Sequence, residues 1–133
     1  MANAMYPSAK QSFISGGIDL TSNTIKVYLI DSADYSYSAA HDFADDVATA
    51  SKVATSGALA SKTVTNGTFG AANVTLSGVT GDQSEAIIVW KDTTDQATSP
   101  VILFFDSSIT GAPVTPNGGD IVIQWNGSGI FAL

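Results

Sequence analysis

Two short, strongly apolar runs, 86–90 and 101–105, form the clearest hydrophobic pattern in the chain. Their residues are mostly β-branched, aliphatic or aromatic, and turn residues border both runs, which is typical of strands. Neither run alternates between apolar and polar positions, so we expect both faces of each strand to be covered. The two runs are therefore predicted to be the central strands of a two-layer β domain.

Alternating or short apolar segments predict further strands on either side of this pair. In residues 24–30, Ile25, Val27 and Leu29 share one face. Further strands are predicted over residues 52–55, 58–64, 73–76, 121–125 and 130–133. Asn66-Gly67 predicts a tight hairpin because both residues tolerate positive φ. The loop 126–129 predicts a second hairpin, between the last two strands.

Two short helical segments are expected outside the strands. Residues 8–15 show partial helical spacing, with Ser8 available as the N-cap and Gly16 as the stop. Residues 41–47 are predicted to form one further helical turn. The fold class is therefore mainly β: an antiparallel β-sandwich of about seven to nine strands, with a short N-terminal helix, in a single domain over residues 1–133.

A long polar segment, 107–120, separates the predicted central strands from the last pair and contains Pro113 and Pro116. Loops of this length in a compact domain are usually functional or disordered. Proline favours extended chain, which suits an arm lying across a partner. A crossover between the two sheets of a sandwich explains the same segment. Both interpretations stay open at the level of sequence.

The charge balance of the chain argues against two classes of partner. Five lysines against twelve acidic residues give a net charge of −7, and there is no arginine among the 133 residues. Nucleic-acid binding needs cations that neutralise phosphates, and arginine is the usual reader of base edges. No polybasic segment is present for an anionic membrane surface. We therefore expect neither nucleic acid nor a membrane as a partner.

The residues that usually carry chemistry are absent or isolated. Cysteine is absent, which excludes disulfides, a thiol nucleophile and cysteine-held metals. The segment 126–129 lacks the flanking pattern of a nucleophile elbow, and 57–63 lacks the spacing of a phosphate loop. His41, Asp42, Asp45 and Asp46 form the one candidate metal group, but an acidic helix end in water explains them too. No catalytic residue, cofactor or metal site is predicted, and we do not expect an enzyme.

Several segments together resemble a family of small structural proteins of tailed bacteriophages. They are residues 5–13, 17–20, 24–31, 54–59, 62–65, 81–83 and 115–120, which together span nearly the whole chain. The resemblance implies a virion component encoded among head genes, namely a capsid cement, or decoration, protein. It brings no catalytic residue with it.

The cement role that the resemblance implies, taken with the residue pattern, leads us to expect a set of partners and contact residues. The protein would be made in the host cytoplasm and would bind the exterior of the capsid, contacting the major capsid protein as a homotrimer or homodimer. The N-terminal segment 1–23 and the arm 107–120 are the expected contacts. The contact residues expected there are Tyr6, Phe13, Ile14, Pro113 and Pro116. Tyr35 and Tyr37 are a further aromatic contact patch or pack on the domain's own edge.

Two other functions are compatible with the same sequence. One is a carbohydrate- or host-surface-binding module of a head or tail fibre, in which Tyr35 and Tyr37, with Trp90 or Trp125, would stack on sugar rings. A tryptophan buried in the core could not serve in this way. The other is a tail-tube or connector subunit, which predicts that the isolated protein forms rings or tubes.

Overall fold

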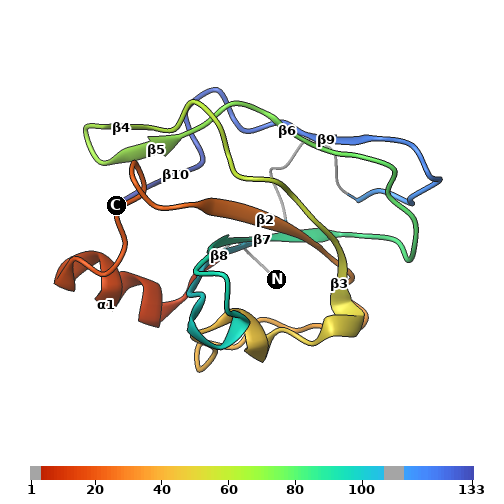
Figure 1. Cartoon of the computed structure of the whole chain (residues 1–133), viewed down its shortest axis with the longest axis horizontal. Coiled ribbons are helices and arrows are strands. Elements are labelled where there is room, and N and C mark those ends of the chain that lie inside the picture. The colour runs from red at the N-terminus through yellow and green to blue at the C-terminus, as the bar shows by residue number, and fades with distance from the viewer. Residues whose placement is uncertain (1–3, 107–112) are drawn as a thin grey trace.

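The computed structural model describes residues 4–106 and 113–133 and shows two layers of antiparallel strands (Figure 1). Within those residues ten strands form three antiparallel sheets, accompanied by one α-helix and isolated 3-10 turns. Two of the ten strands are only two residues long. The predicted mainly β, sandwich-like fold is confirmed.

The larger sheet has five strands and forms the lower layer in Figure 1. Its order is β1 (Ala4–Met5), β8 (Val101–Phe105), β7 (Ala86–Lys91), β2 (Ile25–Ile30) and β3 (Lys52–Thr55). Both apolar runs that dominate the sequence are therefore adjacent inner strands, as predicted. The run 86–90 is buried throughout, and the run 101–105 is buried except for the half-buried Phe105.

Two small sheets form the upper layer (Figure 1). One has the order β10 (Phe131–Ala132), β5 (Thr68–Gly70), β4 (Thr63–Thr65), and the other pairs β6 (Val74–Leu76) with β9 (Ile121–Ile123). Asn66 and Gly67 form the predicted two-residue turn of the β4–β5 hairpin, with φ of 51° and 79°. Such positive φ values at both turn positions match the twist of a hairpin.

One hairpin and the extent of one strand predicted for this layer are wrong. The segments 121–125 and 130–133 do not form a hairpin, because β9 pairs with β6 and β10 pairs with β5. Pairing with β6 places four inward apolar side chains in register, which the local turn at 126–129 could not provide. The strand predicted over 58–64 begins only at Thr63, since Leu59 N–H donates to the Ile25 carbonyl and Ser61 adopts a positive φ of 53°.

The five-stranded sheet is covered on both of its faces. Val27, Val89 and Leu103 are cross-strand partners on the face toward the upper layer. Tyr28, Ile88 and Phe104 are partners on the opposite face. There the Phe104 ring packs against tyrosines of the 31–51 segment, at centroid distances of 5.9 and 6.0 Å. The two apolar runs do not alternate because both faces of their strands are buried. The strands of the upper layer cover one face, and the 31–51 loop segment covers the other.

The helix α1 (Pro7–Ser15) starts one residue before the predicted N-cap. Pro7 occupies its first turn, where a fixed φ and a missing N–H are tolerated, and Tyr6 is the N-cap. Ser8 is therefore not the cap; its hydroxyl donates to the His41 carbonyl at 3.4 Å. Gly16 ends the helix in the left-handed conformation, as predicted, with φ of 81°. Across the described ranges, no helix is both long and apolar enough to cross a membrane.

The described part of the predicted arm is held by its own domain; its first residues, 107–112, lie outside the described residues. Val114 and Ser84 exchange two backbone hydrogen bonds, at 2.8 and 2.9 Å. Val79 N–H donates to the Gly119 carbonyl, and Gly118 N–H donates to the Val79 carbonyl. Residues 113–120 therefore behave as a connection between the two layers. A 3-10 turn at Ala44–Asp46 matches the helical turn predicted over 41–47.

Candidate functional site

Two of the predicted contact residues lie in the core rather than on the surface. Tyr6 is fully buried and Tyr35 is only 5% exposed. Their hydroxyls share a hydrogen bond of 2.7 Å, and Tyr6 N–H donates to the Ile102 carbonyl. Both rings help to cover the lower face of the five-stranded sheet, so the prediction that they contact a partner is corrected. Tyr37 is half-buried against the Tyr6 ring at 4.9 Å.

The other predicted contact residues keep some exposure. Ile14 is 89% exposed at the end of α1. Phe13 is half-buried, with its ring 6.0 Å from that of Phe131. Pro113 is exposed and Pro116 is half-buried on the connection between the layers. The N-terminal segment is therefore the part of the predicted contact set that presents a large apolar side chain to solvent.

An apolar groove of about 500 Å³ runs between the end of α1 and the β4–β5–β10 sheet. Its lining is mostly hydrophobic: Phe13, Gly16, Ile18, Asp19, Leu20, Thr21, Val64, Gly67, Phe69, Phe131 and Leu133. Val64 is 50% exposed and Leu133 is 68% exposed. Asp19 is the one ionisable side chain of this lining, and hydrogen bonds from Thr21 and then Ser22 lower its pKa to about 2. The sequence predicted Phe13 as a contact residue but not Val64 or Leu133, because no motif or pattern marks these two residues as exposed.

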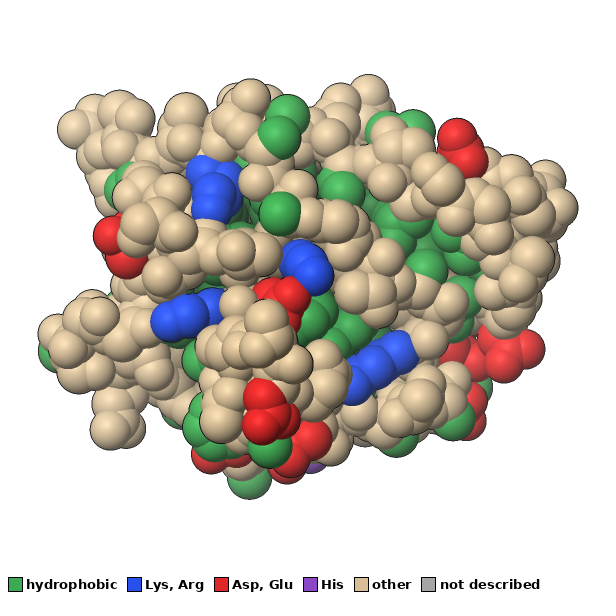
Figure 2. Space-filling model, viewed as in Figure 1, with side chains coloured by type: hydrophobic (Ala, Val, Ile, Leu, Met, Phe, Trp, Pro, Cys, Tyr) green, Lys and Arg blue, Asp and Glu red, His purple; other side chains and the backbone are tan. Residues whose placement is uncertain are grey.

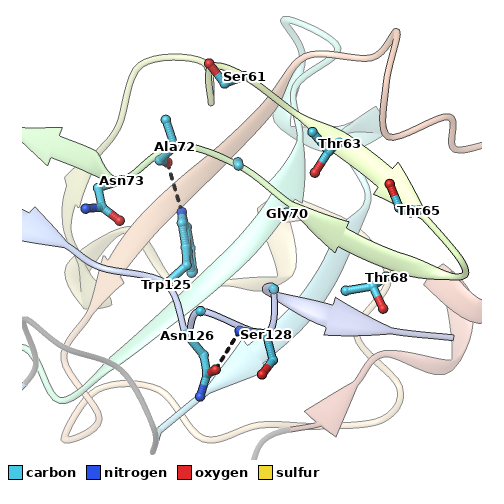
Figure 3. A pocket seen from close by; sticks show the side chains of 13 residues that line it. Ser61, Thr63, Thr65, Thr68, Gly70, Ala72, Asn73, Trp125, Asn126 and Ser128 are labelled. Carbon is cyan, nitrogen blue, oxygen red and sulfur yellow. Dashed lines mark hydrogen bonds between the residues drawn. The ribbon is translucent and has the colours of Figure 1, made fainter.

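A second groove, of about 530 Å³, lies on the outer side of the upper layer around Trp125 (Figure 3). Its lining has no charged side chain: Ser61, Thr63, Thr65, Thr68, Gly70, Ala71, Ala72, Asn73, Trp125, Asn126, Gly127, Ser128 and Gly129. The indole N–H of Trp125 donates to the Ala72 carbonyl at 3.1 Å. We call this the Trp125 groove. Its small polar residues belong to no recognisable motif, so the sequence indicated only the tryptophan.

Trp90, the other tryptophan proposed for sugar stacking, is not available for it. It is 2% exposed, and its ring lies parallel to that of Tyr28 at a centroid distance of 4.5 Å. Its indole N–H is buried and has no hydrogen-bond partner within the part of the chain that the structure describes. The sequence-based alternative is therefore corrected for Trp90 and for the buried Tyr35, and Trp125 is the tryptophan that keeps partial exposure.

A hollow of about 690 Å³ lies beside the Tyr28–Trp90 pair, on a face where basic side chains gather around exposed hydrophobic atoms (Figure 2). Lys26 forms a 2.6 Å ion pair with Asp92, and the hydrogen bond from Lys26 lowers the pKa of that carboxyl. Lys52 donates to the Ala44 carbonyl and to Gln96 Oε1, both at 2.9 Å, and burial lowers the pKa of its ammonium group. Both cations already have protein partners, so they give no reason to place a ligand in this hollow.

The histidine and aspartates weighed as metal ligands have other roles. His41 Nδ1 lies 2.8 Å from the Tyr35 hydroxyl. Asp46 accepts backbone hydrogen bonds from Asp42 and Phe43, and the bond from Asp42 lowers the pKa of Asp46. Asp46 thus caps the 3-10 turn, which is the acidic helix-end interpretation.

A different group of carboxylates does come together. Ligand atoms of Asp31, Asp34 and Asp82 lie within 4.8 Å of one another. Asp34 and Asp82 are exposed, and Asp31 already accepts a hydrogen bond from the Ala33 N–H. Exposed carboxylates often lie this close without an ion, so their proximity alone does not define a metal site.

Comparison with known proteins adds no family to this description. No protein-family model matches the chain, and no curated protein matches it significantly. Two surfaces therefore stand as candidate sites on their geometry: the apolar groove beside α1 and the uncharged Trp125 groove. Both are suited to binding, one to an apolar surface and the other to a polar, uncharged ligand.

Proposed function

We propose that the protein is a structural component of a tailed-phage virion that binds the exterior of the capsid lattice and stabilises the head. The resemblance of its segments to small phage structural proteins supports this proposal. The negative charge and the lack of arginine suit the outside of a DNA-filled shell better than the inside. The protein acts by binding, and no step of the proposed function needs catalysis.

The observation that carries the proposal is the apolar groove, to which Phe13 and Gly16 contribute from the end of α1, the segment that also exposes Ile14. Clusters of exposed apolar side chains on a soluble protein often mark interaction surfaces. Here Ile14, Val64 and Leu133 expose 89%, 50% and 68% of their surface. Burying such side chains against a neighbour contributes about 25 cal/mol per Å² of apolar area. The groove and the end of α1 together form the surface that contacts the major capsid protein.

Binding of this kind stabilises a shell by mass action, because the protein binds the assembled lattice and not its dissociated subunits. A capsid lattice repeats around symmetry axes, and closed homo-oligomers are the arrangement that matches such axes. A homotrimer or homodimer is the form that we propose on the lattice. Each copy would then present the same groove to an equivalent capsid subunit.

The proposal is tested with expanded capsids that lack the protein. Purified protein is added, the capsids are pelleted, and the bound copies per capsid are measured. We expect Ile14→Ser and Val64→Ser each to lower occupancy at limiting protein concentration. Val122→Ser is the matched control, because Val122 is 45% exposed on β9 and lies outside the groove. All three changes are at exposed positions, so each should alter the free energy of unfolding by only about 0.5 kcal/mol.

The results distinguish a wrong contact surface from a wrong function. Wild-type occupancy in both Ile14→Ser and Val64→Ser would remove the groove from the mechanism. Failure of the unmodified protein to bind expanded capsids would overturn the proposed function. Rings or tubes formed by the isolated protein would instead favour a tail or connector subunit.

A further inference from the structure

The indole of Trp125 is held in one orientation by the protein itself. Its N–H donates to the Ala72 carbonyl at 3.1 Å, and the ring lies 6.4 Å from that of Phe105 beneath it in the sandwich. Trp125 nevertheless stays partly exposed, whereas Trp90 is buried. A binding surface whose side chains are already ordered loses little conformational entropy when a ligand arrives. Trp125 is thus a preorganised flat aromatic surface at the edge of a groove.

Hydroxyl and amide groups surround this ring. Figure 3 shows the side chains of Thr63, Thr65 and Thr68 to one side of Trp125, and Asn73 and Asn126 nearer to it. Asn126 Oδ1 accepts the Ser128 N–H at 2.8 Å, which orients its amide. Groups of this kind both donate and accept hydrogen bonds. The groove therefore offers a dense set of neutral polar groups beside one aromatic face.

The chemistry of the lining selects a class of ligand. A phosphate or carboxylate would find no lysine or arginine in the lining, and a cation would find no carboxylate. A purely apolar ligand would bury hydroxyls without partners, which is costly. A pyranose ring matches both halves of the groove, because its C–H face packs on an aromatic ring and its hydroxyls exchange hydrogen bonds with serine, threonine and asparagine. The volume of about 530 Å³ lies within the range of ligand pockets.

We propose that the Trp125 groove binds a neutral pyranoside, with one sugar ring stacked on the Trp125 indole. Glycines keep the space open for it. Around the position that a Cβ of Gly127 would take, no atom lies within 4 Å. Gly127 lines the groove, so a larger side chain at position 127 would occupy open space at the groove without disturbing the packing, and we expect it to exclude a ligand.

This site is separate from the apolar groove. The two linings share no residue, and strand β4 contributes Val64 to one and Thr63 and Thr65 to the other. Alternate residues of a strand point to opposite faces, so the two grooves lie on opposite sides of the β4–β5–β10 sheet. If the proposed capsid contact through the apolar groove is correct, a bound copy would leave the Trp125 groove free.

The test uses the two indole N–H signals of the ¹⁵N-labelled protein. Maltotriose, cellotriose and triacetylchitotriose are titrated separately, and the Trp125 signal is assigned from the Trp125→Phe variant. We expect at least one probe to shift the Trp125 indole signal and the Asn126 side-chain amide saturably, with a Kd of about 1 mM. The Trp90 indole, buried elsewhere, is an internal control and should not move. A triuronate is the charged probe, and we expect it to bind more weakly than the best neutral trisaccharide.

Matched variants test the geometry. Saturation transfer from the protein to the best probe is expected to be lost in Gly127→Leu and retained in Gly57→Leu, since neither glycine has a positive φ or an atom within 4 Å of its added Cβ. Trp125→Ala should weaken binding by roughly tenfold or more. No shift of Trp125 with any of the neutral probes would overturn the proposal, as would equal binding by Gly127→Leu or tighter binding of the triuronate. Capsid occupancy of Trp125→Ala should be unchanged, so failure here is distinguishable from failure of the proposed function.

Discussion

The hydroxyls of Tyr6 and Tyr35 lie 2.7 Å apart and join the start of α1 to the 31–51 segment inside the core. The Tyr35 hydroxyl also lies 2.8 Å from His41 Nδ1, so it has two side-chain partners. The hydrogen bond described for the Tyr6 hydroxyl is the one with Tyr35. Tyr6→Phe leaves Tyr35 with His41 and should cost about 1 kcal/mol of the free energy of unfolding. Tyr35→Phe strands a buried hydroxyl and should cost about 1–3 kcal/mol.

The double variant makes this prediction sharper. When both hydroxyls are removed, no buried donor is left stranded between the rings, so Tyr6→Phe/Tyr35→Phe should be no less stable than Tyr35→Phe alone. Urea unfolding of the three variants, followed by circular dichroism, measures the coupling. Additive losses in the double variant would show that the two hydroxyls contribute independently.

Stability should fall steeply above pH 10. Burial, with the hydrogen bond to Tyr35, raises the pKa of Tyr6, and burial also raises the pKa of Tyr28 and of Tyr35 above the ordinary 10.0. Above that pH the unfolded chain loses these protons while the folded state keeps them, so the folded state binds more protons and is destabilised as pH rises. The stabilisation is complete below pH 10 and is lost as the pH rises further. A tyrosine that stays neutral in the folded state while it is ionised in the unfolded chain contributes a loss of about 1.4 kcal/mol per pH unit.

Urea midpoints between pH 9 and pH 11.5 check this dependence, with tyrosinate absorbance as a second signal. Tyr28→Phe should reduce the slope by about one tyrosine's share. Lys52 works in the opposite direction, because burial lowers the pKa of its ammonium group, but it is one group against three tyrosines. A midpoint that stays constant up to pH 11.5 would contradict the burial of the phenol groups.

Replacing Ser84 with alanine should not lower the stability of the fold. Its side chain is fully buried, and its hydroxyl has no hydrogen-bond partner within the described part of the chain. Because a buried hydroxyl without a partner costs free energy, Ser84→Ala should leave the protein equally stable or about 1 kcal/mol more stable. Ser51→Ala is the control: the Ser51 hydroxyl donates to the Ala48 carbonyl at 2.6 Å, and its loss should cost about 1 kcal/mol. Thermal unfolding of both variants gives the comparison.

Gly127 and Gly129 are two positions apart and should respond differently to alanine. Gly129 has φ of 108°, and an added Cβ would lie 2.5 Å from Thr68 Cγ2 and 3.0 Å from the Phe69 carbonyl oxygen. Gly129→Ala should therefore cost about 1–3 kcal/mol. Gly127→Ala meets no atom within 4 Å and should be neutral or stabilising by up to about 1 kcal/mol. Equal melting temperatures of the two variants would contradict this account of the loop.

Strands were predictable wherever their signal is local. The alternation of 24–30 and the apolar runs 86–90 and 101–105 identify β2, β7 and β8 to within a residue or two. Asn66-Gly67 identifies its hairpin because the turn conformation depends on those two residues. The pairing of strands does not depend on local sequence in this way. The partner of β9 is β6, more than forty residues earlier, and no short turn joins the two strands.

The candidate sites were less predictable, because exposure depends on the arrangement of layers. Trp90 and Trp125 each end a segment predicted to be a strand, yet the loop cover buries Trp90 and the edge of the upper layer leaves Trp125 partly exposed. Tyr6 and Tyr35 are residues that suit either a surface or a core, and the fold-back of the 31–51 segment places them inside. Thr63, Thr65 and Asn73 line one groove with Trp125 only once the chain is folded.

The double cover of β7 makes the two layers mutually dependent. Val89 faces the strands of the upper layer, and Ile88 faces the loop segment on the other side of the sheet. Loss of either cover would therefore expose apolar side chains of β7, the central strand, to water. Neither half is therefore a self-sufficient folding unit. Limited proteolysis should yield the intact chain or short peptides rather than a durable fragment, and any split-protein version would need both pieces present before either becomes structured.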